Sequence, residues 1–263
     1  MSSTNRGTSV HVLRKVALIL DRLAEEGEVS AARLAELVGE PRSTVYRLLT
    51  SMQALDYVTP GARRGTYRLG LALLRLGSAV AASFDVRQAA LPQMKHVHEE
   101  TGETVFLCVR RGHEAVCIER IEGLWVRSIA LRLGGALPLH VGAAPRALLA
   151  AEPRELWEAY VAREERLVAW TENTPVTKRS LFAALDRVRE TGIAISDEDV
   201  VLGMAAVGAS IRDHHGAACA ALSISGPRPT ILGDREREST VLIAAAAAEI
   251  SRSLGYETRS VTA

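Results

Sequence analysis

The sequence predicts an α+β protein with two domains joined by helices, and three observations lead to this prediction. First, apolar residues recur at helical spacing in three short segments before residue 56. Second, a segment with glycines and paired arginines follows them, as in a β-hairpin. Third, from residue 104 apolar and polar residues alternate, as in antiparallel strands, with helical segments between. We therefore expect a flexible tail at 1–9, a winged helix-turn-helix at 10–69, linker helices at 70–102 and an antiparallel-sheet domain at 103–258.

Composition limits the class of protein. The chain has 263 residues, of which 48% are hydrophobic and 24% charged, a composition typical of globular proteins. No run of about 18 apolar residues is present, and the polar N-terminus does not resemble a secretory signal, so we expect a cytoplasmic protein with no membrane partner. Three cysteines, Cys108, Cys117 and Cys219, show no C-x-x-C spacing, which argues against a disulfide framework and a zinc site.

The first two helices are predicted from apolar stripes and helix boundaries. Gly27 ends the first helix, Ser30 is suited to cap the second, and Gly39 ends it. The first helix, at 10–26, is expected to bury Leu13, Val16, Ala17, Leu20, Leu23 and Ala24, and the second to bury Leu34, Leu37 and Val38.

The third helix follows a short turn and begins near Pro41, a residue suited to a first helical turn. Its inward side is predicted to hold Val45, Leu48, Leu49, Met52 and Leu55. In a helix-turn-helix, this last helix enters the DNA major groove. Arginine can pair with guanine there, while serine, threonine and tyrosine can reach phosphates or bases. The candidates on the outward side are Arg42, Ser43, Thr44, Tyr46 and Arg47, with Thr50 further along.

A hairpin with two arginines at its tip is predicted after the third helix. Tyr57 and Val58 fall on one strand, Thr66, Tyr67 and Leu69 on the other, and Arg63 and Arg64 between them. Such a wing is suited to contact the DNA backbone or minor groove. Residues 1–75 hold 11 basic and 7 acidic side chains, a balance that favours a phosphate-binding module. The alternative is a small-molecule sensor whose N-terminal module docks a protein partner.

Three motifs in order resemble the IclR family of bacterial transcriptional regulators. Residues 29–70 resemble its winged helix, GGALPLHVGAAPRALLA at 134–150 resembles its G-x-x-L-P-L-H segment, and residues 187–227 end in its S-x-S-G-P. The resemblance spans nearly the whole chain. It implies a DNA-binding regulator, more often a repressor, that works as a homodimer or tetramer on a pseudo-palindromic double-stranded operator. It also implies a GAF-like C-terminal fold that binds a small-molecule effector.

Small residues dominate the C-terminal motifs, so a ligand could approach the backbone there. Serine hydroxyls and the start of a helix near Pro145 would suit a small carboxylate. By resemblance, the effector site comprises Ala143, Ala144, Met204, Ala206, Ser223 and Ser225. The alternative is that these residues only permit close strand packing. One departure from the family is Pro145-Arg146 in place of its usual Gly-Lys.

The remaining elements follow from pattern. A helical linker with an apolar side at Leu71, Leu74, Val80 and Ala81 is either a dimer contact, as the family implies, or a buried helix. We expect a hairpin turning at 110–114, a strand leading into 134–140, strands at 192–199, 205–216 and 218–226, helices at 145–171 and 176–192, and a last helix ending at Gly255.

No catalytic or cofactor motif is found: the sequence lacks G-x-S-x-G, H-E-x-x-H, a P-loop and G-x-G-x-x-G. We therefore expect a protein that is not an enzyme and that needs neither cofactor nor metal. The acidic run at 197–199 could suggest a cation site, but a solvated segment or a partner for arginines is favoured. His214 and His215 are expected in a solvated turn, and Cys219 as a small buried hydrophobe.

Overall fold

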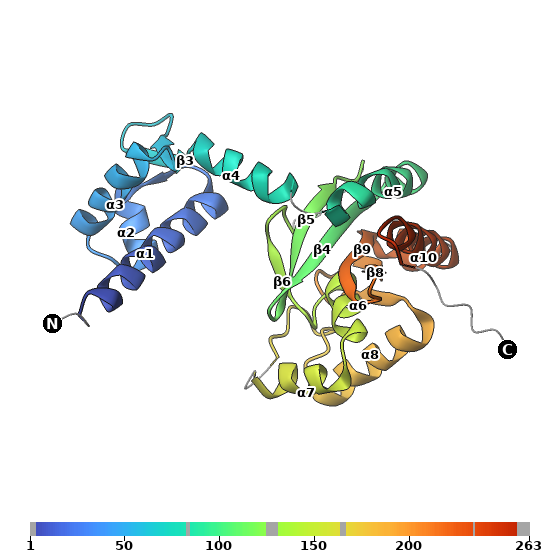
Figure 1. The fold of residues 1–263 in the computed structure, drawn as a ribbon. Helices are drawn as coiled ribbons and strands as arrows, with labels where there is room; N and C mark the ends of the chain where they lie inside the picture. The colour runs from blue at the N-terminus through green and yellow to red at the C-terminus, as the bar shows by residue number, and fades with distance from the viewer. Residues whose placement is uncertain (1–3, 83–84, 125–130, 164–166, 234, 257–263) are drawn as a thin grey trace. The chain divides into compact units, whose positions relative to one another are not determined.

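The computed structural model describes residues 4–82, 85–124, 131–163, 167–233 and 235–256 (Figure 1). The chain divides into two compact units, Met1–Ser83 and Phe84–Ala263. This division falls inside the linker predicted at 70–102. One of its helices, α4 (Leu71–Ala82), lies in the first unit, and the other, α5 (Asp85–Thr101), packs against the sheet of the second.

The first unit is a winged helix. Its helices are α1 (Thr4–Glu26), α2 (Ala31–Val38) and α3 (Arg42–Ala54). The predicted hairpin is formed by β2 (Val58–Pro60) and β3 (Thr66–Leu69), and a strand not foreseen, β1 (Val29–Ser30), pairs with β3. The predicted caps of α2 are confirmed: Ser30 accepts a hydrogen bond from the Arg33 amide, and Gly39 is left-handed.

Two details of this unit differ from the prediction. Residues 4–9, expected in a flexible tail, belong to α1. The buried side of α1 is also rotated: Ile19 and Leu23 are buried, whereas Leu13, Ala17 and Ala24 are exposed. Apolar residues lie on more than one side of this helix, so spacing alone allowed two stripes. In α3 the buried residues are as predicted except Leu55, which caps the helix and is exposed.

The second unit is built on a six-stranded sheet whose strands all pair antiparallel, in the order β6-β5-β4-β9-β8-β7. The predicted antiparallel α+β domain is therefore confirmed. The strands are β4 (Thr104–Arg111), β5 (Glu114–Ile121), β6 (Ala136–Pro138), β7 (Ala194–Asp197), β8 (Met204–Arg212) and β9 (Ala218–Pro227). Residues 125–130 of the strand expected before residue 134 lie outside the described residues.

Both faces of this sheet are covered, and alternation along the strands decides which residue faces which helices. Phe106 and Ala221 pack with α6 (Ala143–Ala151), α7 (Arg154–Arg163) and α8 (Lys178–Thr191). Their neighbours Leu107 and Leu222 pack on the opposite face with α5, α9 (Arg228–Leu232) and α10 (Glu236–Ser253). The sheet thus separates two hydrophobic cores.

The helices of this unit differ from the prediction in one region. The single helix expected at 145–171 is two helices, because the chain leaves the helical conformation at Glu152, directly before Pro153. Residues 167–177 are not helical. By contrast, α8 begins within two residues of the predicted start, after a capping box between Thr177 and Ser180. The last helix, α10, ends before Gly255 as predicted.

Candidate DNA-binding and ligand-binding sites

The outward side of α3 is a polar surface held by a buried apolar side. Val45, Leu48 and Leu49 anchor the helix in the core of the first unit. The opposite side presents the predicted candidates: Arg42, Ser43, Tyr46 and Arg47 are exposed, and Thr44 is half-buried. The structure therefore brings all five predicted residues of α3 to one end of the helix.

The two arginines of this surface are available to bind anions. Within the described residues, neither Arg42 nor Arg47 forms an ion pair. The residue at the N-cap position is Pro41, whose side chain provides no capping hydrogen bond. The first amides of the helix and these guanidinium groups therefore give one end of α3 a positive potential.

The predicted wing has its two arginines in the exposed turn between β2 and β3, and one of them has an acidic partner. Glu28 Oε1 accepts a hydrogen bond from the Arg63 amide at 2.9 Å and from Thr66 Oγ1 at 2.5 Å, and lies 3.5 Å from Arg63 Nε. These hydrogen bonds, with Thr66 first, lower the pKa of Glu28 to about 2. Glu28 therefore anchors the wing and competes for Arg63, whereas Arg64 has no ion pair within the described residues.

The six predicted effector residues gather on the α6 side of the sheet. Ser225 of β9 lies opposite Ala206 of β8, and Ser223 lies opposite Gly208. Met204 shares its strand and alternation with Ala206, so it belongs to the same face. A side chain at position 208 would come within 3.1 Å of the backbone of Ala143 and Ala144, so glycine lets the start of α6 lie directly on β8.

The serine hydroxyls of this face have unused hydrogen-bonding capacity. Ser223 is only 4% exposed and Ser225 is half-buried. Neither hydroxyl has a hydrogen-bond partner among the residues that the structure describes. A hydroxyl that has no partner within the protein can donate a hydrogen bond to a ligand or to water.

The start of α6 is already occupied by an acidic side chain of the protein. The Gly142 amide donates to Asp199 Oδ2 at 3.2 Å, Arg146 forms a buried ion pair with the same oxygen, and Ser196 donates to Oδ1. Asp199 is 2% exposed and Arg146 4%. The prediction that this helix start attracts a ligand carboxylate therefore loses its basis, because Asp199 supplies the anion.

This ion pair gives a structural role to Arg146 of the Pro145-Arg146 departure and to one residue of the acidic run. Arg146 has its own carboxylate partner, 53 residues further along the chain. Within the acidic run, Asp197 pairs with Arg228 at 2.6 Å on the surface. Asp197 and Asp199 both pair with an arginine, as expected. The alternative expectation, that the acidic run is solvated, is wrong for Asp199, which is buried. Among the described residues, no group of three His, Cys, Asp or Glu side chains could hold a metal.

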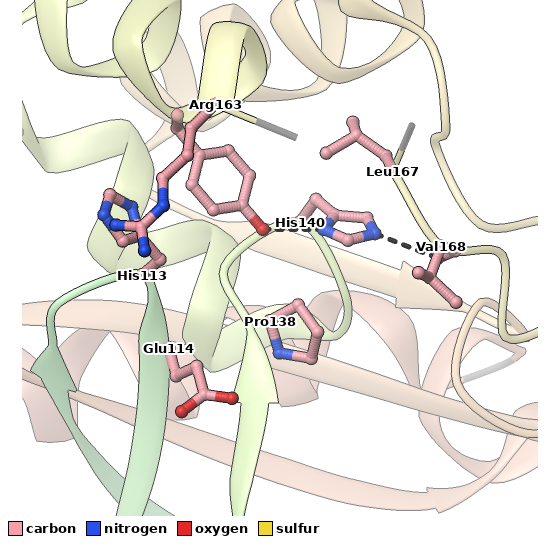
Figure 2. A pocket seen from close by; sticks show the side chains of 8 residues that line it. His113, Glu114, Pro138, His140, Arg163, Leu167 and Val168 are labelled. Carbon is pink, nitrogen blue, oxygen red and sulfur yellow. Dashed lines mark hydrogen bonds between the residues drawn. The ribbon is translucent and has the colours of Figure 1, made fainter. Parts of the chain in front are cut away.

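A cavity that sequence reasoning missed lies beside the β5–β6 edge (Figure 2). Its volume is about 310 Å³, and none of the predicted effector residues lines it. His140 Nε2 lies 3.0 Å from the Val168 carbonyl and must donate to it, so neutral His140 accepts at Nδ1 from the Tyr160 hydroxyl, 2.7 Å away. Its lining comprises His113, Glu114, Pro138, His140, Tyr160, Arg163, Leu167 and Val168.

The wall of this cavity combines apolar surface with charge. Pro138 and Leu167 are apolar, whereas Arg163 is cationic and Glu114 acidic. In Figure 2, Arg163 and His113 point to one side of the cavity and Val168 lies at the other. The arrangement could hold a small organic molecule with an anionic group. No local motif marks it, because its lining comes from four separate segments.

Sequence profiles of two domain families match this chain. The profile described as the IclR helix-turn-helix domain matches residues 12–61, and that of the bacterial transcriptional regulator IclR C-terminal domain matches residues 78–252. The chain belongs to the IclR family. Its members are bacterial transcriptional regulators, so the resemblance of the three sequence motifs is confirmed.

Similar members of the IclR family align over nearly the whole chain. The HTH-type transcriptional regulator KipR of Bacillus subtilis is 32% identical over 93% of this chain and 97% of its own length. The transcriptional repressor IclR of Escherichia coli is 32% identical over 94% and 90%. The crystal structure of the Thermotoga maritima IclR shares 31% identity, covers 94% of this chain and 100% of its own, and superposes with a TM-score of 0.78.

A further IclR homologue, from Microbacterium hydrocarbonoxydans, was solved in complex with 4-hydroxybenzoate. It shares the fold with a TM-score of 0.81 at 24% identity, covering 92% of this chain and 98% of its own. As for membranes, no helix within the described parts of this IclR-family chain is long and apolar enough to cross one.

Proposed function

We propose that this protein is a cytoplasmic transcriptional repressor that binds a pseudo-palindromic operator as a homodimer or a dimer of dimers. A small organic carboxylate bound in the second unit would shift it toward a state with lower operator affinity. The observation that supports the proposal most is the exposed side of α3, with Arg42 and Arg47 outside any ion pair of the described residues. That it represses rather than activates transcription is supported by relatives named as repressors.

In the proposed complex, α3 lies in the major groove. Arg47 and Tyr46 project from the exposed side of the helix and would reach base edges, while Arg42, Ser43 and Thr44 at its start would bind phosphates. Arg63 and Arg64 of the wing would contact the adjacent backbone or minor groove. These contacts separate the residues that read sequence from those that supply affinity.

Self-association is supported by leucines that the chain leaves exposed. In α4, Leu71 is 73% exposed and Leu74 is 67% exposed; in α1, Leu13 is 66% exposed. Large apolar groups on a helix surface favour a protein contact. Sedimentation velocity should show a dimer or larger species, and Leu74→Glu should shift it toward the monomer. A wild-type monomer at micromolar concentration would contradict this part of the proposal.

The ligand would bind at the serine face of the sheet. Ser223 and Ser225 would donate to a carboxylate, since Asp199 already occupies the start of α6. A solved protein of the same fold is a complex with 4-hydroxybenzoate, so small aromatic and aliphatic acids are the first ligands to test.

The deciding experiment is fluorescence anisotropy with the full chain on DNA from upstream of its own gene, at two salt concentrations, with random DNA as control. We expect tighter, sequence-preferring binding that weakens with salt. Small acids are then screened for release of the DNA. Lack of binding even at low salt would contradict the proposal and favour the alternative, a small-molecule sensor whose N-terminal module docks a protein partner.

Two substitutions locate the ligand once an active acid is known. Ser223→Ala with Ser225→Ala should weaken ligand binding in calorimetry, because two donors to the carboxylate are lost. Arg163→Ala is the matched change in the cavity of Figure 2 and should leave the affinity unchanged. The reverse pattern would move the effector site to that cavity.

A further inference from the structure

Two cysteines that do not form a C-x-x-C motif face each other across neighbouring strands. Cys108 of β4 and Cys117 of β5 are direct register partners. The register shifts at Leu107/Cys108, so Cys117 rather than Ile118 lies opposite Cys108. Both thiols are fully buried on the α6 side of the sheet. No local sequence pattern indicates this pair, because the turn at Gly112 and the shift in register together set the pairing.

The backbone around Cys117 identifies the kind of pair. The Cys117 amide donates to Gly135 O at 2.9 Å, and Cys117 O accepts from the Gly134 amide at 2.8 Å. Both backbone groups of Cys117 therefore point away from β4. Cys108 and Cys117 form a non-hydrogen-bonded pair, in which the Cα atoms of antiparallel strands approach to about 4.5 Å. Disulfides need Cα atoms roughly 4.4–6.8 Å apart, a range that includes the spacing of a regular pair of this kind.

The two thiols also differ in their protonation. Contact with the Cys108 side chain lowers the pKa of Cys117 despite its burial, and the Arg120 guanidinium acts in the same direction, while the Cys117 thiol donates to the Glu119 carbonyl, 3.3 Å away. Contact with Cys117 and burial raise the pKa of Cys108 well above its usual value. Cys117 is thus the better nucleophile of the pair, and Cys108 the protonated partner held against it.

From this geometry we propose that Cys108 and Cys117 are a redox-modification site, which a peroxide or another small two-electron oxidant converts reversibly into a cross-strand disulfide. The Cys117 thiolate attacks one peroxide oxygen, the O–O bond breaks, and the hydroxide released takes up a proton, which leaves a sulfenic acid. The Cys108 sulfur then attacks the Cys117 sulfur, the S–O bond breaks, and the hydroxyl leaves as water with the Cys108 proton. In total, two thiols and one hydrogen peroxide give one disulfide and two waters.

The cysteine pair lies on the same face of the sheet as the proposed ligand site, so its oxidation can change the geometry of that site. Phe106 lies two residues before Cys108 on the same face and is the register partner of Ser223. A disulfide draws the two sulfur atoms to about 2.05 Å, closer than a hydrogen-bonded pair of thiols. The oxidised chain would therefore hold β4 and β5 more closely at one end of the serine face.

The test is thiol counting on the folded full chain. The reduced protein is exposed to hydrogen peroxide or diamide, unfolded in an alkylating reagent and weighed. We expect the oxidised species to lose two hydrogens, to retain one alkylated cysteine, Cys219, and to yield a peptide pair linked through Cys108 and Cys117. Dithiothreitol should restore three alkylated cysteines. Three free thiols in the folded chain after treatment that oxidises the unfolded chain would overturn the proposal, as would a linkage through Cys219.

Two variants make the test specific. Cys219→Ser is the matched control and should still lose both remaining thiols together. Cys108→Ser removes the resolving thiol, so Cys117 should stop at the sulfenic acid and react with dimedone. Should this variant fail to fold, the peptide linkage in the wild-type chain still decides the question. A disulfide that links two chains on a non-reducing gel, in place of the internal one, would refute the assignment.

Discussion

Two helices of this protein begin without a side-chain cap of their own, and they differ in what lies at their first turn. At the start of α3, Arg42 and Arg47 are exposed and outside any ion pair of the described residues. At the start of α6, the Gly142 amide already binds Asp199, and the helix is buried from Ala143 to Ala150. The first helix start can accept an external anion such as DNA phosphate, whereas the second is neutralised from within.

The difference shows how far a local sequence can predict a site. Everything that makes the start of α3 a candidate DNA-binding surface lies within a few residues, so periodicity and residue type were sufficient. Whether the start of α6 can bind an external anion depends on Asp199, which lies 57 residues from Gly142 in the sequence. The same limit applies to Glu28, which is 35 residues from Arg63 and reaches it only because β1 pairs with β3.

The largest expected effect tests the start of α6, which Asp199 neutralises. Asp199→Ala leaves Arg146 buried without its carboxylate and should lower the free energy of unfolding by about 3–5 kcal/mol. The measurement is urea denaturation followed by tryptophan fluorescence, to which Trp157, fully buried in the core that contains α6, contributes. Asp197→Ala removes an exposed pair with Arg228 and should cost at most about 1 kcal/mol. Equal losses would show that the buried pair has no special role.

The next effect tests the start of α3, where Arg42 and Arg47 can bind an external anion. Arg47→Ala should weaken binding to the specific operator by about 1–3 kcal/mol if Arg47 reads a base, and should reduce discrimination at one position. Anisotropy on the operator and on single-base variants measures both quantities. Arg33→Ala is the control, because Arg33 is also exposed but pairs with Glu36 on α2. An unchanged operator affinity for Arg47→Ala would refute base reading by this side chain.

A smaller effect is expected at the wing. Arg64→Ala should reduce the slope of log affinity against log salt by about 0.9, the contribution of one phosphate contact. Arg63→Ala should reduce it less, because Glu28 already neutralises part of the Arg63 charge. Arg22→Ala on α1, where Arg22 pairs with Glu25, should leave the slope unchanged. Identical slopes for all four proteins would count against DNA contact by the wing.

The smallest effect concerns the pH dependence of the wing anchor. The folded pKa of Glu28 is about 2 against an ordinary 4.5. Its stabilisation is therefore complete above pH 4.5 and is lost as the pH falls from 4.5 through about 2. The amide shift of Arg63 in NMR spectra of the folded protein should titrate with a midpoint near pH 2, and Glu28→Gln should abolish the titration. A midpoint near 4.5 would mean that the hydrogen bonds to Glu28 do not form in solution.

Local patterns predicted much of this fold. The cap at Ser30, the turn at Gly112 and the alternation along the strands depend on neighbouring residues, and the structure has each of them. Prediction was wrong where two local solutions compete, as on α1, or where a proline divides a helical segment, as at Pro153. The cavity beside Tyr160 and the pairing of Cys108 with Cys117 could not be read locally, since tertiary contacts create both.

The burial of α6 also determines where a protease can enter this chain. Trypsin cleaves after arginine, but Arg146 lies in a helix buried at eight consecutive positions and is not accessible until the second unit unfolds. Arg63 and Arg64 lie in an exposed turn, where native proteins are commonly nicked. Limited proteolysis should therefore cut first at the wing, and a fragment ending at Arg146 reports unfolding of the second unit. Protection of the wing by operator DNA would be visible in the same digest.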